Sequence, residues 1–110
     1  MDELVKIVCD ELDKKLAEDI VVIDFEKRNP VTDYFVIASA RNARHASSLV
    51  DSAIEEVSKY GYAIKSYDAS KDGKWLFIDL YEVVVHIFLK EEREIYALER
   101  LWKDQKILKL

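Results

Sequence analysis

The stretch KWLFIDLYEVVVHIFL, residues 74–89, decides the centre of the fold. Two apolar runs, 74–80 and 83–89, flank the pair Tyr81-Glu82, and this pattern predicts two antiparallel strands joined by a hairpin. A loop centred on that pair sets three cross-strand pairs: Trp75 with Phe88, Phe77 with His86, and Asp79 with Val84. Tyr-Glu lacks the Gly or Asn that tight hairpins prefer, so a loop of three or five residues, with another register, stays open.

Side chains alternate along a strand, and this gives the predicted hairpin two unlike faces. One face is wholly apolar and is expected in the core: Leu76, Ile78, Leu80, Val83, Val85, Ile87 and Leu89. The other face mixes aromatic, apolar and polar side chains: Trp75, Phe77, Asp79, Val84, His86 and Phe88. We expect part of the Trp75 ring, at the start of its strand, to reach solvent on this mixed face.

Hydrophobic periodicity assigns the rest of the chain. Amphipathic helices are predicted at 3–16, about 42–59 and 93–102, and further strands at 20–25, 33–40 and 62–67. Gly61 is expected to end the second helix. The order α-β-β-α-β-β-β-α, with one right-handed parallel crossover over 33–67, predicts a mixed five-stranded sheet flanked by helices, in a single α/β domain spanning residues 1–110.

Composition narrows the class of protein. The 110 residues carry a formal net charge of −5, which argues against general nucleic-acid binding and is compatible with a basic partner. The N-terminus lacks the features of a signal peptide, and no apolar run approaches the ~20 residues of a membrane span. A lone cysteine, Cys9, excludes an internal disulfide and fits a reducing compartment. We therefore expect a cytoplasmic protein with no membrane partner.

Two histidines are the candidates for chemistry. His86 lies diagonal to Asp79 on the mixed face, and such a pair can orient a general base, but the sequence offers no nucleophile beside it. We therefore interpret His86 as a structural residue that binds Asp79 or a backbone carbonyl. His45 lies with Arg41 and Arg44 at the start of the long helix, where a phosphate can bind, although an exposed polar turn explains the same residues.

Other kinds of site are not indicated. Two distant histidines and one cysteine do not make a metal site, and the only glycines, Gly61 and Gly73, leave no phosphate-binding glycine loop. We assign no catalytic, metal-binding or cofactor-binding residue. The large amphipathic side chains Trp75, Tyr81, Tyr96 and Trp102 lie in or beside polar segments, as interface residues often do. The residues alone thus favour a binding module over an enzyme.

Three stretches, TDYFVIASA (32–40), KWLFIDL (74–80) and VVVHIFLKEEREIYALERLW (83–102), resemble the ribosomal silencing factor, or Iojap-like, family. The resemblance implies a nucleotidyltransferase-like fold without its chemistry. It also implies binding to the large ribosomal subunit through ribosomal protein L-fourteen, a block to small-subunit association, and reduced translation under nutrient limitation. A homodimer is also compatible with the family.

The resemblance and the exposed aromatic residues together assign a set of partner-binding residues: Trp75, Leu76, Asp79, Tyr81, Leu101 and Trp102. Trp102 is expected to be partly core, and Arg41, Arg44 and His45 are candidates for a minor contact with ribosomal RNA. The chain departs from the family pattern at the hairpin, where Tyr81-Glu82 replaces a glycine, and at Ala40. Two other functions stay open, namely a residual nucleotide-binding or nucleotidyl-transferring enzyme and a ribosome assembly factor.

Overall fold

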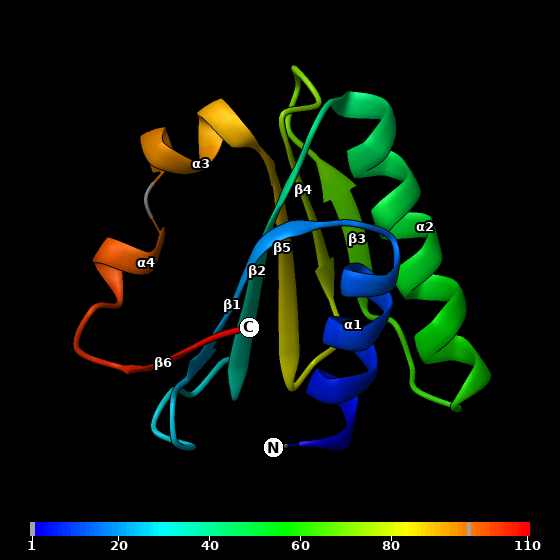
Figure 1. Cartoon of the computed structure of the whole chain (residues 1–110). Helices are drawn as coiled ribbons and strands as arrows, with labels where there is room; N and C mark the ends of the chain where they lie inside the picture. Colours follow the sequence, from blue (N-terminus) through cyan, green and yellow to red (C-terminus); the bar gives the residue numbers. More distant parts are fainter. Residues whose placement is uncertain (1, 97) are drawn as a thin grey trace.

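Helices lie on both sides of a central sheet in the computed structural model, which describes residues 2–96 and 98–110 (Figure 1). The helices are α1 (Glu3–Lys14), α2 (Ala43–Lys59), α3 (Lys90–Tyr96) and α4 (Leu98–Leu101). The strands are β1 (Glu18–Asp24), β2 (Tyr34–Ala40), β3 (Ser66–Ala69), β4 (Trp75–Asp79), β5 (Val83–Leu89) and β6 (Lys106–Lys109). No helix among these residues is long and apolar enough to cross a membrane.

The six strands form one mixed sheet in the order β3-β4-β5-β2-β1-β6. The central pair, β2 and β5, is parallel, and every other neighbouring pair is antiparallel. The crossover from β2 through α2 leads to β3, which runs in the same direction as β2 but lies at the far edge, because β4 and β5 lie between them. The mixed sheet and the crossover confirm the predicted α/β class.

The sheet has six strands, one more than the five predicted from the sequence. β6 pairs with β1 in antiparallel fashion, with Ile107 opposite Ile23 and Lys109 opposite Val21. Its four residues, KILK, are too short and too charged to predict a strand from periodicity alone. The strand forms because β1 offers an edge whose backbone groups need partners.

Several predicted boundaries are also wrong, two of them by three residues or more. The strand expected at 62–67 begins at Ser66, because Tyr62 and Ile64 pack against the core from a loop instead of pairing in the sheet. The final helix, expected at 93–102, begins at Lys90, and α4 ends at Leu101, so Trp102 lies in a turn. Periodicity locates buried side chains well, but it locates the ends of elements poorly.

One face of the sheet is closed by α1 and α2 (Figure 1). Asp2 caps α1 by accepting a hydrogen bond from the Leu4 amide at 2.9 Å, and Asn42 caps α2 by accepting from the His45 amide at 2.8 Å. Behind these caps each helix turns an apolar stripe onto the sheet. We call this side the closed face. The apolar hairpin residues lie there as predicted, since Ile78, Leu80, Val83, Val85, Ile87 and Leu89 are all buried in its core.

The hairpin register is as predicted, with Trp75 opposite Phe88, Phe77 opposite His86, and Asp79 opposite Val84. The Leu80 amide donates to the Val83 carbonyl at 2.8 Å, which leaves Tyr81 and Glu82 as the two-residue loop. Tyr81 adopts a φ of 72°, a left-handed conformation that suits glycine better than tyrosine. The tight turn is therefore kept here at some cost in backbone strain.

Candidate functional site

The mixed face of the hairpin belongs to the side of the sheet opposite α1 and α2, which we call the open face. A series of ring contacts crosses this face from β4 to the turn after α4. Trp75 contacts His86 with ring centroids 5.8 Å apart, His86 contacts Phe35 at 4.6 Å, and Phe35 contacts Trp102 at 6.2 Å. Trp75 also stacks on Phe88 at 5.2 Å. One aromatic surface thus joins the hairpin to the C-terminal segment.

Trp75 and Trp102 are half-buried in this arrangement, as expected for both. Trp102 meets Phe25 edge-on with centroids 5.1 Å apart, and so belongs partly to the core. The sequence pattern does not single out Phe35 or Phe25 as members of the surface. Alternation along β2, which sends Phe35, Ile37 and Ser39 to one side, is the signal from which Phe35 can be found.

His86 is buried in the middle of the ring series, as a structural role requires. The hydrogen-bond partner expected for it, Asp79 or a backbone carbonyl, is wrong. Its Nδ1 accepts a hydrogen bond from the indole N–H of Trp75 at 3.1 Å, not from any group of Asp79. The neutral ring therefore carries its proton on Nε2, for which no described residue is a hydrogen-bond partner. Burial lowers the pKa of His86 to about 4, so the ring is neutral at pH 7.

Asp79 and Tyr81 lie at the other end of β4 from Trp75. One carboxylate oxygen of Asp79 accepts the Tyr81 amide at 2.9 Å and supports the strained turn, while the other lies 3.9 Å from Lys65 Nζ. The Tyr81 side chain is 57% exposed, which makes it one of the most accessible large side chains of the protein. Leu101, next to Trp102, is 70% exposed. Accessible side chains therefore lie at the hairpin loop and beside Trp102, at the margins of the open face.

Leu76 does not share this surface. Strand alternation turns it to the closed face, where it is half-buried against the core beneath α2. Of the six residues expected to bind a partner, the structure brings together five in one region of the open face and its rims: Trp75, Asp79, Tyr81, Leu101 and Trp102.

His45 does not contribute to the phosphate site that was expected at the start of α2. His45 is buried, its Nδ1 accepts the Arg41 amide at 3.1 Å, and its Nε2 contacts the Lys15 carbonyl at 2.9 Å. Both ring nitrogens are thereby engaged, Nδ1 with the turn before α2 and Nε2 with the end of α1, so the ring is not available to a phosphate. Arg41 and Arg44 remain exposed.

Other reactive groups are few. Burial raises the pKa of the Cys9 thiol to about 12, so this cysteine is a packed side chain. Within residues 2–96 and 98–110, no group of three or more His, Cys, Asp or Glu is placed to hold a metal ion. Fold and surface together define a small α/β domain with one closed face and one aromatic, partly accessible face.

Comparison with known proteins gives the family. The family model described as "Ribosomal silencing factor during starvation" matches residues 1–110. The ribosomal silencing factor of Bacillus subtilis is 34% identical over 101 residues, which cover 92% of this chain and 86% of that protein. The chain belongs to the ribosomal silencing factor family, which implies ribosome-associated regulation of translation.

Solved structures agree with the fold. A crystal structure of a protein from Chromobacterium violaceum superposes with a TM-score of 0.87 at 27% identity, covering 96% of this chain and 90% of that one. A crystal structure from Bacillus halodurans gives a TM-score of 0.83 at 29% identity and 98% coverage of both chains. The relation to nucleotidyltransferases implied by the resemblance stays a prediction.

Proposed function

We propose that this protein binds the large ribosomal subunit through ribosomal protein L-fourteen and, once bound, sterically prevents the small subunit from joining. Translation then falls when nutrients are limiting. The observation that carries the proposal is the aromatic surface of the open face, flanked by the exposed side chains of Tyr81 and Leu101, in a member of the ribosomal silencing factor family.

The chemistry of this surface suits a protein partner. Trp75 is held by the Phe88 stack and by its hydrogen bond to His86, so little side-chain entropy is lost when a partner covers it. Phe77, Asp79 and Val84 are half-buried beside it, and none of them is closed off completely. Rigid aromatic side chains with an accessible margin are the usual centre of a binding interface.

Charge gives the surface its specificity. The chain has a formal net charge of −5, which attracts a basic ribosomal protein and repels bare RNA. On the open face of the sheet, two carboxylates lie beside the aromatic residues: Asp79 on β4, and Asp68 on β3 opposite Phe77. We infer that these carboxylates meet Lys or Arg side chains of the partner, and that Arg41 and Arg44 make at most a rim contact with ribosomal RNA.

The mechanism is occlusion without turnover. One bound protein blocks one large subunit, so inhibition of subunit joining should follow the molar ratio of protein to subunit. The experiment is co-sedimentation with isolated large subunits and, separately, with small subunits, followed by a joining assay in which small subunits are added last. Binding to large subunits alone, with joined ribosomes lost in proportion to bound protein, is the expected result.

Two double variants test which surface binds. Tyr81→Ala with Leu101→Ala removes two accessible side chains at the margins of the open face, one at the hairpin loop and one beside Trp102. The control, Tyr60→Ala with Leu16→Ala, removes side chains of the same types that are 62% and 63% exposed elsewhere. We expect the first pair to weaken large-subunit binding by at least tenfold, about 1.4 kcal/mol, and the control to leave it unchanged.

Three results would overturn the proposal. They are equal binding by the two double variants, preferential binding to small subunits, and a block to joining that persists at strongly substoichiometric protein. The last would indicate turnover and hence an enzyme. Incubation with nucleotide and Mg²⁺ checks this separately, since an enzyme that uses them should consume the nucleotide, whereas simple binding leaves it unchanged.

A second function, assembly of the large subunit, is favoured by one relative. The mouse protein named "Mitochondrial assembly of ribosomal large subunit protein 1" is 35% identical over 99 residues, which cover 78% of this chain and 39% of that protein. An assembly factor should bind immature large-subunit particles more tightly than mature ones. Sedimentation with both kinds of particle separates the two functions.

A further inference from the structure

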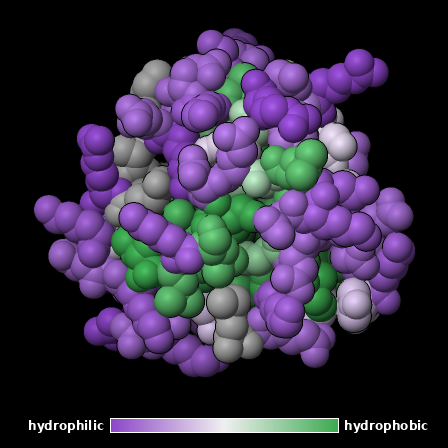
Figure 2. Space-filling view, in the orientation of Figure 1, coloured by the Kyte–Doolittle hydropathy of each residue, from purple (hydrophilic) through white to green (hydrophobic). Residues whose placement is uncertain are grey.

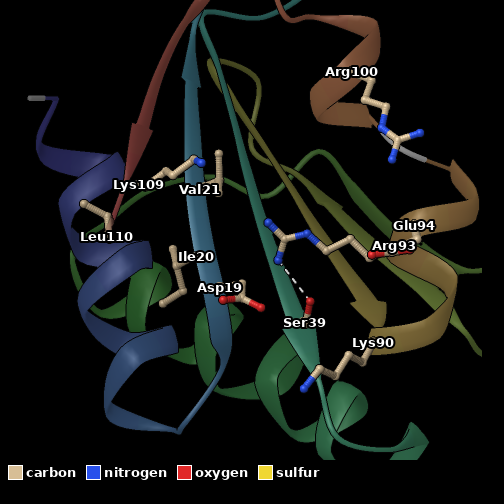
Figure 3. A pocket seen from close by; sticks show the side chains of 10 residues that line it. All are labelled: Asp19, Ile20, Val21, Ser39, Lys90, Arg93, Glu94, Arg100, Lys109 and Leu110. Carbon is tan, nitrogen blue, oxygen red and sulfur yellow. Dashed lines mark hydrogen bonds between the residues drawn. The ribbon is translucent and has the colours of Figure 1, made fainter.

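A pocket of about 390 Å³ with several charged side chains lies at the end of the sheet that is farther from the hairpin loop (Figure 3). Its wall is formed by the start of β1, the end of β2, the last residues of the chain, and α3 with α4. Four of its side chains are cationic: Lys90, Arg93, Arg100 and Lys109. None of the residues assigned to ribosome binding lines it.

The topology of the sheet places the pocket where α/β folds bind ligands. β2 and β5 are adjacent and parallel, and they end together, with Ala40 opposite Leu89. From these ends the chain leaves in opposite directions, because α2 packs on the closed face and α3 on the open face (Figure 1). A crevice forms beside the carboxyl ends of neighbouring strands whose connections diverge in this way, and ligands bind in such crevices.

Arg93 gives the pocket a positioned positive charge. This side chain is only 9% exposed, and its Nη1 donates to Ser39 Oγ at 2.9 Å across the gap between α3 and β2. Ser39 is itself 2% exposed, and alternation along β2 directs it to the same side as Phe35 and Ile37. In Figure 3 the guanidinium of Arg93 points from α3 toward β2, to the inner wall of the pocket. A guanidinium held in this way loses little entropy when it binds an anion.

The balance of charge in the pocket is opposite to that of the protein. Among the residues that the structure describes, its four cationic side chains face the carboxylates of Asp19 and Glu94, with Glu18 beside Lys90, in a chain of formal net charge −5. Lys90 is engaged in part, since its Nζ lies 3.6 Å from Glu18 in an exposed ion pair. Such exposed pairs contribute little and exchange readily. A local excess of positive charge in a concave site favours an anion.

The walls indicate what kind of anion fits. Beside the cationic groups lie the apolar side chains of Val21 and Leu110, whereas the neighbouring Ile20 side chain is buried in the closed-face core, so one part of the pocket is charged and another is hydrophobic. The volume also lies within the range of about 300–1,000 Å³ typical of small-molecule sites and is larger than a single phosphate requires. We propose that this pocket binds a small phosphorylated organic molecule, with the phosphate on Arg93, Arg100 and Lys109 and the organic part against Val21 and Leu110.

Titration calorimetry on the isolated full-length protein tests the proposal without any ribosome, so its outcome does not depend on the function proposed above. The probes are adenosine 5′-monophosphate, inorganic phosphate, and adenosine without a phosphate, at low ionic strength. We expect saturable binding of one nucleotide per chain, at least tenfold weaker binding of inorganic phosphate, and no binding of adenosine. Raising the salt concentration should weaken nucleotide binding, because the site is partly exposed.

Charge reversal locates the site. Arg100→Glu with Lys109→Glu changes two exposed pocket residues, and Lys71→Glu with Lys103→Glu makes the same charge change at exposed positions outside it. The pocket pair should weaken nucleotide binding at least tenfold and the control pair by less than twofold. If the pocket pair lowers the melting temperature, Arg100→Gln with Lys109→Gln gives the same comparison with a milder change.

Two kinds of result would overturn the proposal. One is the absence of saturable binding by both the nucleotide and inorganic phosphate, or equal weakening by the pocket and control pairs. The other is a single-stranded RNA that binds the wild type but not the pocket pair, while the nucleotide and inorganic phosphate do not bind. That result would assign the positive charge to an RNA backbone and not to a small molecule.

Discussion

The closed and open faces of the sheet are built from the same strands, yet they differ in almost every physical property. On the closed face, α1 and α2 cover a wholly apolar core in which Leu12, Val36 and Leu49 have no exposed surface. The open face carries a smaller cluster around Phe25 and Phe88, with half-buried aromatic rings at its margin. Figure 2 shows apolar side chains gathered at the centre of one side of the molecule and polar side chains around them.

The difference shows how a domain of this size divides its surface between stability and binding. A face closed by two helices removes a large apolar area from water and supplies most of the folding free energy. The opposite face is then free to keep features that add little stability, such as the buried histidine of the ring series, the strained turn at Tyr81 and the charged pocket beside Arg93. We expect substitutions on the closed face to act on folding and those on the open face to act on binding as well.

The largest effect is expected on the closed face. Leu49→Ala removes a fully buried side chain from α2 and should lower the free energy of unfolding by about 2–5 kcal/mol, because it leaves a cavity. Ile54→Ala, at a half-buried position of the same helix, should cost clearly less. Urea denaturation measures the free energy of unfolding of both variants. Similar losses in the two variants would mean that the closed face is not a rigid core.

The pH dependence of stability tests the buried histidine of the open face. The unfolded chain binds a proton on His86 near its ordinary pKa of 6.5, whereas the folded chain does so only near about 4. Stability from this group is therefore complete above pH 6.5 and falls by about 1.4 kcal/mol per pH unit below it, to a total loss of roughly 3 kcal/mol by pH 4.

The matched control for that measurement is His86→Gln, which does not titrate but can still accept a hydrogen bond from the Trp75 indole. Urea denaturation between pH 4 and pH 7 should give a shallower loss of stability for this variant than for the wild type. Parallel curves would show that the imidazole is not excluded from protonation in the folded state.

Trp75 tests whether one side chain on the open face serves both folding and binding. Trp75→Ala loses the Phe88 stack and leaves His86 Nδ1 without its donor, so we expect a loss of about 2 kcal/mol in stability together with weaker large-subunit binding. Trp75→Phe keeps a ring for stacking but has no N–H, and it should retain more stability than the alanine variant. Thermal denaturation measures the stability of the two variants, and co-sedimentation measures their binding to large subunits. If the alanine variant is as stable as the wild type and binds fully, Trp75 contributes neither to folding nor to binding.

The smallest expected effect has the opposite sign. Tyr81→Gly relieves the left-handed backbone at φ 72° and should raise the free energy of unfolding by about 0.5–1 kcal/mol, while weakening ribosome binding through loss of the ring. Tyr81→Ala loses the same ring but keeps the strain, so it should weaken binding without the gain in stability. If the glycine variant is less stable than the alanine variant, the turn is not strained.

The sequence by itself determined the hairpin and the closed face. Strand alternation in 74–89 was enough to separate the two faces, because side-chain direction in a strand follows from backbone geometry alone. The pairing of Trp75 with Phe88 also needed a loop centred on Tyr81-Glu82, which the structure confirms. The apolar stripe of α2 and the positive φ of 85° at Gly61 follow from equally local rules. The family could likewise be inferred from linear motifs, since these are read directly from the chain.

Only the tertiary structure decided the partners of the two histidines, the sixth strand and the pocket. His86 bonds Trp75 and not Asp79, and His45 joins α2 to Lys15, because such contacts depend on how whole elements pack and not on spacing along one element. β6 forms only where β1 leaves an edge open, and the pocket exists only where α3 crosses the ends of β2 and β5. Interactions between segments distant in the sequence are set by the assembled fold, and no local pattern encodes them.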